Sequence, residues 1–253
     1  MQVNQVYDLP LDGVVEKDEE GNVEKSYRRK NGRMHGECIL LYPSGKLKGR
    51  SFYEEGLLQG VSCFYSSDGQ LLSSTYFLEG KAEGEAKQFY LSGHLYAKLY
   101  YKEGHLQGSQ EYFYENGQLK TSLFYERGAL EGEVLLFWPS GSLKRHCFYS
   151  LGIKTGKERI LTEEGVLVDE GEYLQGSPVG VHRRWYSQGV LRQEKIYHPK
   201  GNFDARRWDD QERLEYEGIY LGEKNFKETK FFWPEGTKQE REGMWDGERC
   251  HFK

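Results

Sequence analysis

The chain has 253 residues, of which 37% are hydrophobic and 15% aromatic, with 31 glycines against six prolines. Its formal net charge of −5 excludes an overall positive field that would draw it to nucleic acid or to an anionic membrane. No apolar run approaches the roughly 18 residues that suggest a membrane-spanning helix. The first ten residues lack the basic and apolar regions of a cleaved signal peptide.

Glycines recur along the chain at a constant step of 24 residues. Self-similarity of this length, kept without insertion or deletion over seven copies, is typical of a repeat array. The sequence therefore predicts one elongated array whose length follows the number of copies. The recurring pair is Gly32 and Gly36, Gly56 and Gly60, Gly80 and Gly84, Gly104 and Gly108, Gly128 and Gly132, Gly152 and Gly156, and Gly176 and Gly180; a third glycine recurs at Gly45, Gly69, Gly93, Gly117, Gly141, Gly165 and Gly189.

The N-terminal part predicts a short leader, residues 1–11, followed by half a copy. Residues 14–16 read as a brief strand and residues 18–22 as a turn, with Gly21 in register with the later glycines. Arg28 and Arg29 stand where later copies have an aromatic pair, as expected of an atypical terminal repeat.

Each full copy predicts a β-hairpin. In the first copy, residues 37–42 and 47–53 carry the aromatic and β-branched residues of strands, and residues 43–46 form a tight turn between them. Residues 55–60 are expected to turn the chain into the next copy. Turns this short allow only antiparallel neighbours. The predicted fold is all-β: an elongated single-layer antiparallel β-meander of about eight to nine 24-residue hairpins.

Alternation along the strands sorts the side chains into two faces. Three positions recur on one side, which we call the inner face, and we expect them to be buried. They are Leu47, Leu71, Leu95, Leu119, Leu143, Leu167 and Leu191; Tyr53, Phe77, Tyr101, Tyr125, Tyr149, Tyr173 and Tyr197; and Leu41, Tyr65, Phe89, Phe113, Phe137, Leu161 and Trp185.

The opposite side, the outer face, has a further aromatic position in five copies. This outer column consists of Phe52, Tyr76, Tyr100, Phe124 and Phe148. It stops at Glu172, and the seventh copy keeps only Ile196. Two interpretations stay open: the column stabilises a one-layer sheet, or it is an exposed apolar strip that binds a partner. We expect further aromatic residues to lie beside it: Tyr42, Tyr90, Tyr114, Trp138 and Tyr186.

After Gly189 the register of the repeat slips. The recurring leucine position projects onto Glu215, and the nearest leucine, Leu214, is one residue early. We interpret residues 12–197 as the repeat array and residues 198–253 as degenerate copies that cap it, because terminal repeats commonly differ from the rest.

One copy, residues 112–132, has an aromatic pair, an Asn-Gly turn followed by x-Leu-Lys, a second aromatic pair and Gly-x-x-x-Gly. This unit resembles the MORN-repeat variant of bacterial proteins, clearly over residues 12–197 and loosely over 205–253. The resemblance implies an antiparallel meander with a grooved surface that serves as a scaffold. Some MORN proteins are associated with membranes or phosphoinositides, and some bacterial relatives of the variant are catalogued as antitoxins of toxin–antitoxin pairs. The family has no shared catalytic residues that could be carried over.

The sequence holds none of the familiar motifs of phosphate-binding loops, nucleophile elbows, zinc proteases or Cys-x-x-Cys sites. The seven histidines have no metal-ligand spacing, and the four cysteines do not recur with the repeat. We interpret the cysteines as unpaired thiols in a reducing compartment. We therefore expect no enzyme activity and no catalytic, cofactor-binding or metal-ligating residues.

The leading functional hypothesis is a non-catalytic, cytoplasmic scaffold that binds a protein partner along the aromatic-lined sheet. An antitoxin-like inhibitor of a toxin is an alternative that the family resemblance supports. Peripheral membrane or phosphoinositide association is a second alternative, against which the acidic charge balance argues. A third, delivery as a secreted effector, is compatible with the leader. We expect no nucleic-acid partner, and the irregular ends of the array favour a monomer over filaments.

Overall fold

The computed structural model describes residues 13–221, 225–245 and 250–252. These residues form β-strands and one short 3-10 turn, η1 (Pro199–Gly201), and no α-helix occurs in the described ranges. The chain divides into a first unit, residues 1–120 with 124–128, and a second unit, residues 121–123 with 129–253. The predicted leader, residues 1–11, lies outside the described residues.

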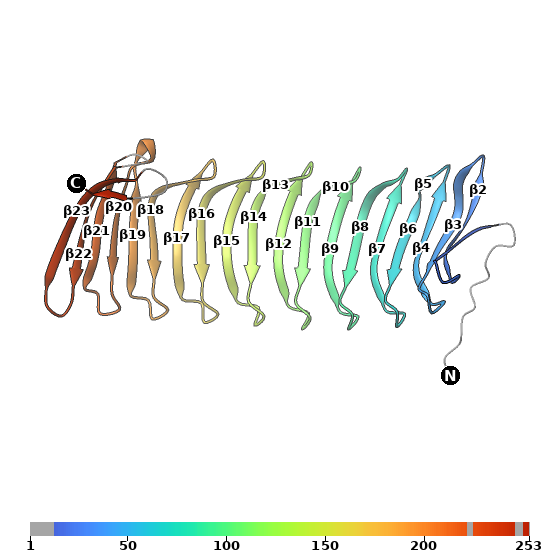
Figure 1. Cartoon of the computed structure of the whole chain (residues 1–253), viewed down its shortest axis with the longest axis horizontal. Helices are drawn as coiled ribbons and strands as arrows, with labels where there is room; N and C mark the ends of the chain where they lie inside the picture. The colour runs from blue at the N-terminus through green and yellow to red at the C-terminus, as the bar shows by residue number, and fades with distance from the viewer. Residues whose placement is uncertain (1–12, 222–224, 246–249, 253) are drawn as a thin grey trace. The chain divides into compact units, whose positions relative to one another are not determined.

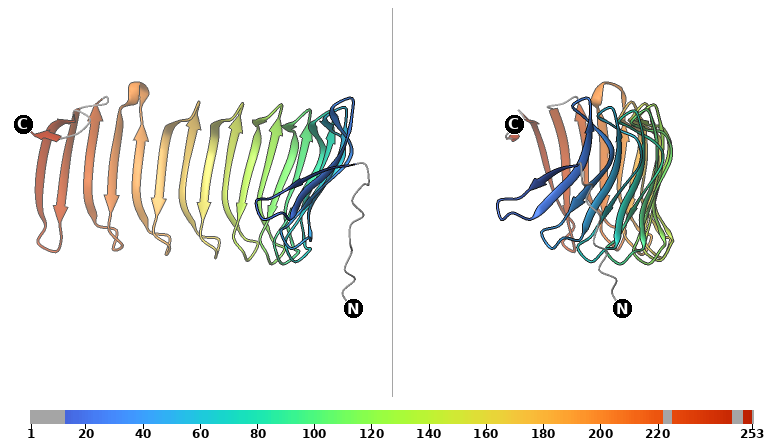
Figure 2. Two further views of the ribbon diagram at one scale, coloured as in Figure 1. Left: turned by 45° about the vertical axis from the view of Figure 1, so that its right-hand side comes forward. Right: turned by 90° about the vertical axis from the view of Figure 1, so that its right-hand side faces the viewer.

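Each unit is one layer of strands, and strands that follow one another in the chain pair antiparallel (Figures 1 and 2). This confirms the predicted fold class, an antiparallel meander of repeated hairpins. The first unit contains β1 (Val14–Lys17), β2 (Val23–Lys30), β3 (Arg33–Leu41), β4 (Leu47–Glu54), β5 (Leu57–Leu58), β6 (Gly60–Tyr65), β7 (Leu71–Leu78), β8 (Lys81–Phe89), β9 (Leu95–Lys102), β10 (His105–Leu106), β11 (Gly108–Phe113) and most of β12 (Leu119–Glu126). The second contains β13 (Ala129–Leu130), β14 (Gly132–Phe137), β15 (Leu143–Ser150), β16 (Ile153–Leu161), β17 (Leu167–Leu174), β18 (Ser177–Trp185), β19 (Leu191–Tyr197), β20 (Phe203–Trp208), β21 (Leu214–Leu221), β22 (Asn225–Phe232), β23 (Thr237–Trp245) and β24 (Cys250–Phe252).

The loop between the two strands of each hairpin is a short turn that ends on the recurring glycine. In the first copy the Tyr42 amide donates to the carbonyl oxygen of Lys46 at 2.9 Å, and the Gly45 amide donates to that of Tyr42 at 2.8 Å. Gly45 has φ 78°, in the left-handed region that favours glycine. The same bonds recur at every hairpin turn from Tyr42 to Val190, so the conformation explains the constant glycine.

The Gly-x-x-x-Gly segment is not one turn, and the predicted turn over residues 55–60 was wrong in extent. Only Glu55 and Gly56, at φ 49° and 87°, form the loop, because Glu54 already pairs with Leu57 in β5. A two-residue loop with both residues at positive φ matches the right-handed twist of the flanking strands. Gly60, at φ 76°, lies at the start of β6, where its left-handed backbone interrupts the strand.

Side chains from one copy cap the turn of the next. The residue before the second glycine of the pair, Gln or Glu, accepts a hydrogen bond from the backbone amide at the following two-residue loop. Each such bond satisfies an amide that would otherwise depend on solvent. The bonds are Glu79 N to Gln59 Oε1 (3.0 Å), Glu103 N to Glu83 Oε2 (2.8 Å), Arg127 N to Gln107 Oε1 (2.8 Å) and Leu151 N to Glu131 Oε2 (2.8 Å).

The most buried positions differ from the three predicted columns, which are half-buried except for Leu41. The buried side chains lie between those columns on the inner face and are mostly small. In the first unit, Tyr96, Tyr101, Leu106 and Tyr112 pack against a buried cluster of Ala86, Ala97 and Leu99. In a one-layer sheet the large rings cover small neighbours and stay partly in solvent themselves. The buried inner-face residues include Cys38, Ser51, Ser62, Ala86, Leu99, Gln110, Val134, Cys147 and Glu158.

The slip of the repeat after Gly189 conceals a further hairpin, β20–β21. Its turn keeps the usual pattern: the Asp209 amide donates to the Arg213 carbonyl oxygen at 3.0 Å and the Glu212 amide to that of Asp209 at 3.2 Å. Glu212, at φ 63°, occupies the left-handed position that glycine holds in the other copies. The hairpin is therefore retained although its glycine is lost.

Candidate functional site

The outer column lies on the exposed side of the sheet, as the alternation predicts. In the first unit all four of its members are exposed, from 39 to 46% of their surface: Phe52, Tyr76, Tyr100 and Phe124. Phe148, in the second unit, is half-buried, and its ring lies 4.7 Å from that of His146. The first unit therefore exposes one aromatic ring per hairpin at the same height of the strand.

Charged side chains surround Tyr100. Its hydroxyl donates to Oε2 of Glu85, the residue directly opposite on β8, at 3.0 Å. Bonds to Lys87, Tyr100 and Lys98 lower the pKa of Glu85 to about 2, so this carboxylate stays ionised at neutral pH. The Lys98 ammonium lies 5.7 Å from the centre of the Tyr100 ring. The bond to Glu85 thus orients the Tyr100 ring, and charged side chains surround its exposed surface.

Tyr76 has an apolar setting. The residue opposite it on β6 is Val61, which is 54% exposed. Phe64 is also exposed, at 41%, but it lies on the inner face, opposite Gly49 and Ser73. On the outer face, Tyr76 and Val61 therefore form an exposed apolar pair.

The predicted residues beside the outer column lie elsewhere, at the hairpin turns. The Tyr90 hydroxyl donates to the Phe113 carbonyl oxygen at 2.8 Å, and Trp138 Nε1 donates to that of Leu161 at 3.2 Å. The Lys120 ammonium lies 5.5 Å from the ring centre of Tyr114. Such bonds tie the turn of one copy to the next. Tyr90 packs against Tyr96, which lies four positions before Tyr100 on β9, or about 13 Å along the strand. Tyr90 is therefore well separated from Tyr100 of the outer column.

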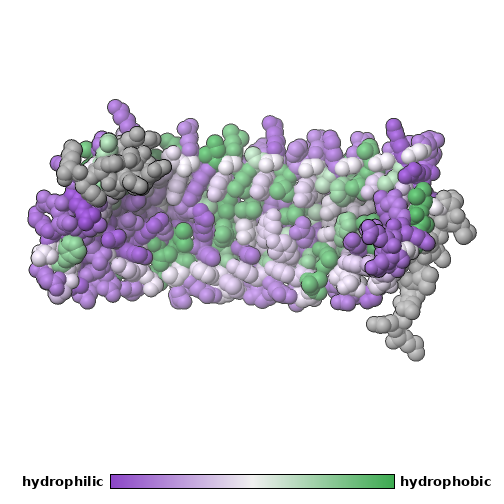
Figure 3. All heavy atoms as spheres, viewed as in Figure 1, coloured by the Kyte–Doolittle hydropathy of each residue, from purple (hydrophilic) through white to green (hydrophobic). Residues whose placement is uncertain are grey.

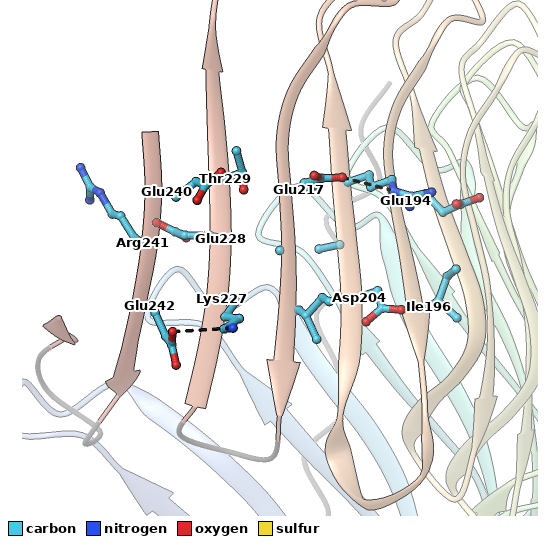
Figure 4. Close-up of a pocket in the computed structure, with 14 residues that line it drawn as sticks. Glu194, Ile196, Asp204, Glu217, Lys227, Glu228, Thr229, Glu240, Arg241 and Glu242 are labelled. Atoms are coloured by element: carbon cyan, nitrogen blue, oxygen red, sulfur yellow. Dashed lines mark ion pairs between the residues drawn. The ribbon is translucent and has the colours of Figure 1, made fainter. Parts of the chain in front are cut away.

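The outer face of the second unit holds a groove of about 620 Å³ across β19–β23 (Figure 4). Ile196 and Ile219 lie within it, between charged residues. Ion pairs cross it, Arg206 with Glu217 at 3.9 Å and Lys227 with Glu242 at 3.7 Å. In the view of Figure 3, hydrophilic residues dominate the surface over β21–β23. Sequence reasoning missed this groove because the outer column ends before it and no other motif marks it.

The inner face of the second unit contains a buried ionic group that the repeat pattern did not reveal. Glu158, 4% exposed, accepts a 2.7 Å bond from Arg145 Nε and a further bond from the Lys154 ammonium. Burial alone would raise the pKa of Glu158, but these two cations outweigh it and hold the pKa below its usual range. None of the three residues recurs in the other copies, so periodicity could not identify them.

Two features bear on catalysis. In the described parts of the chain, no three His, Cys, Asp or Glu residues lie together so as to hold a metal ion. Cys38 and Cys147 are buried free thiols, and burial raises the pKa of both, which makes the reactive thiolate rarer at neutral pH. Neither the search for metal ligands nor the two buried thiols identifies a reacting group among the described residues.

These hairpins define a repeat protein of the β-meander class. Four segments match the family described as "MORN repeat variant", residues 34–55, 82–103, 106–127 and 130–150, so this chain carries MORN-variant repeats. The predicted resemblance to the MORN-repeat variant is thereby confirmed for these four copies. Such repeats suggest a scaffold for interactions with proteins or membranes. Within the described residues, no helix is long and apolar enough to cross a membrane.

No curated protein matches this sequence. Two similar solved structures are the crystal structure of TcdB2-TccC3-Cdc42 and that of TcdB2-TccC3 without hypervariable C-terminal region. The first is 10% identical, with 96% of this chain and 16% of that chain covered and a TM-score of 0.20. The second is 11% identical, with 95% and 15% covered and the same TM-score. This chain spans less than a fifth of either chain's length, and a likeness this weak carries no argument about its fold or function.

Proposed function

We propose that this protein is a non-catalytic repeat scaffold that binds a protein partner through the outer column. The observation that supports the proposal is the exposure of four aromatic rings at one position of successive hairpins in the first unit. Exposed aromatic residues in series give large contact areas at low cost in side-chain entropy, which is why they are frequent in protein interfaces.

The spacing of the rings indicates the kind of partner. Neighbouring strands are about 4.8 Å apart, so two strands per copy place successive rings about 10 Å apart. A segment in the polyproline II conformation that crosses the strands presents every third side chain on one side, at intervals of about 9 Å. The partner would therefore carry apolar side chains three residues apart, with polar residues between them to meet Glu85 and Lys98.

The compartment and the lack of catalysis belong to the same proposal. Cys38, Cys63 and Cys147 are free thiols, which suits a reducing compartment such as the cytoplasm. The proposal needs no cofactor.

The test compares two triple variants of the full chain. Tyr76→Ser/Tyr100→Ser/Phe124→Ser removes the centre of the outer column, and Leu57→Ser/Leu78→Ser/Leu91→Ser removes exposed apolar residues outside it. Partners are captured from native cells by the wild type, identified by mass spectrometry, purified and titrated against all three proteins. We expect the column variant to bind at least about tenfold more weakly and the control to bind normally.

Circular dichroism and thermal unfolding show whether each variant is folded. If the column variant is folded and keeps full affinity, or if both variants lose affinity equally, the proposal is wrong. If the column variant unfolds while the control does not, the column is structural. Sedimentation with anionic vesicles at low salt, lost in the column variant, would replace the protein partner by a membrane surface.

A further inference from the structure

The inner face of β15–β19 in the second unit is positively charged although the chain as a whole is acidic. Alternation places six charged residues on this face. Four are cations and two are carboxylates, which leaves an excess of two positive charges: Arg145, Lys154, Glu158, Asp169, Arg184 and Lys195. In the full copies of the first unit, β3–β11, the corresponding positions are uncharged, so the charge is not a requirement of the repeat. In the half-copy β1–β2 two of these positions hold an ion pair, Lys25 with Glu16.

Both carboxylates on this face are already occupied by other cations. Glu158 is bonded to Arg145 and Lys154. Asp169 accepts a bond from Arg184 Nε at 2.7 Å. No carboxylate of the face therefore remains for Lys195.

Lys195 is half-buried and lacks a carboxylate partner among the described residues. Its ammonium lies 5.0 Å from the centre of the Phe203 ring, and His182 and Ala205 are the residues opposite it on the two neighbouring strands. Burial, and then the nearby Arg184 cation, lower its pKa. A half-buried cation that no anion neutralises is partly desolvated, which is unfavourable, and an added anion would relieve it.

A cavity of about 100 Å³ lies beside this lysine. Its walls include Tyr173, His182, Arg184, Gln193, Lys195 and Tyr197, together with the Asp169 carboxylate that is bonded to Arg184. The His182 ring packs edge-on between the rings of Tyr173 and Tyr197, at 5.2 and 4.9 Å. It occupies the place where a Cβ on Gly171 would lie, because such an atom would be 2.1 Å from His182 Nδ1. The glycine therefore makes room for this wall.

The cavity combines hydrogen-bond donors with one carboxylate, Asp169, which is already bonded to Arg184. Burial raises the pKa of Tyr197 and raises that of Tyr173 to about 12, so both hydroxyls keep their protons at neutral pH. Arg184 and Lys195 have no lone pair to offer. The volume holds one small ion and excludes a nucleotide or a sugar.

We propose that this cavity binds a single small oxyanion, a carboxylate or a phosphate group, through the ammonium of Lys195 with Arg184 beside it. The site lies on the inner face of the second unit and contains no residue of the outer column, so it does not depend on the proposed partner surface. The anion would supply the missing counter-charge and order the aromatic wall of Tyr173, His182 and Tyr197.

The experiment follows lysine side chains by NMR in the full-length protein labelled with ¹³C at lysine Cε. Lys195→Gln identifies the Lys195 resonance. Its pH titration is recorded without added anion and with inorganic phosphate, acetate or chloride at equal ionic strength. The groups that face Lys195 and titrate or carry charge are Asp169, Tyr173, His182, Arg184 and Tyr197, so their variants are not used as controls.

We expect saturable binding of phosphate or acetate that shifts the titration of Lys195 upward, with no saturable effect of chloride. Lys195→Gln and Arg184→Gln should weaken binding at least about tenfold. Lys98→Gln, in the first unit, should leave it unchanged. Saturation by acetate would identify a carboxylate as the source of the anion, and saturation by phosphate alone would identify a phosphate group.

Equal small effects of all three anions would mean simple screening and would overturn the proposal. So would saturable binding that Lys195→Gln leaves intact. Because Lys195→Gln removes an unneutralised, half-buried charge, we expect that variant to remain folded, and circular dichroism checks this.

Discussion

Glu158 is the only described charged residue that is nearly removed from solvent, and it depends on Arg145 and Lys154 for compensation. A buried pair is weak evidence of net stabilisation, but removing one partner leaves the other charges uncompensated. The repeat position that Glu158 occupies holds Cys38, Ser62 and Ala86 in earlier copies. A small neutral residue at the same place shows that the charge is a local feature and not a requirement of the fold.

Replacing Glu158 by Gln should lower the free energy of unfolding by about 2–4 kcal/mol at pH 7, because two cations lose their carboxylate. The folded-state pKa of Glu158 lies below the unfolded value of about 4.5, so its stabilisation is complete above that pH and is lost as pH falls through the folded pKa. The gap between wild type and variant in urea unfolding should therefore shrink below about pH 4.5. Glu163→Gln, on an exposed turn, serves as control; a gap independent of pH would contradict this account.

At the scale of the element, the hairpin owes its constancy to its two turns and to the bonds between copies. The three-residue turn favours glycine at its one left-handed position, although Glu212 holds that position in β20–β21. In the two-residue loop both residues are left-handed: a non-glycine residue such as Glu55 or Leu151, and the glycine that follows it. Side-chain caps such as Gln107 on Arg127 then connect successive loops. The glycine pattern predicts where the turns lie. The hydrogen bond from a side chain of one copy to the loop of the next is visible only in the three-dimensional structure.

Replacing Gln107 by Ala should destabilise the first unit by about 1 kcal/mol, because the Arg127 amide loses its acceptor. Gln107→Glu is the matched variant: Glu83 makes the same cap on Glu103, so this substitution should keep the stability of the wild type. Thermal unfolding followed by circular dichroism measures both. Equal stability of the Ala and Glu variants would show that the cap contributes nothing.

At the scale of the whole molecule, the constant step makes the array modular. Stability in such proteins is approximately a sum over copies and their nearest-neighbour interfaces. Deleting residues 80–103 removes one full step within the first unit and returns every later column to register. We expect this variant to fold with an unchanged type of circular dichroism spectrum. Deleting residues 80–91, half a step, removes one strand of a hairpin and should abolish cooperative unfolding of that unit; equal tolerance of both deletions would contradict the modular account.

Periodicity and turn chemistry in the sequence alone were sufficient to determine the class of fold, the antiparallel pairing and the two faces of each strand. They located the outer column, of which Phe52, Tyr76, Tyr100 and Phe124 are exposed and Phe148 is half-buried. The turns and the alternation recur in successive copies, and this recurrence allows them to be recognised from the sequence alone.

Only the tertiary structure decided how deeply each position is buried and which charges meet. In one layer of strands, burial depends on how far neighbouring rings lean over small residues, so Ala97 is buried and Tyr101 is not. Glu158 meets Arg145 across strands whose register is shifted by a bulge between His146 and Phe148. Lys195 is isolated because the residues opposite it, His182 and Ala205, carry no carboxylate. A bulge moves one side chain relative to its partners without changing the 24-residue step, and for this physical reason the sequence periodicity could not reveal it.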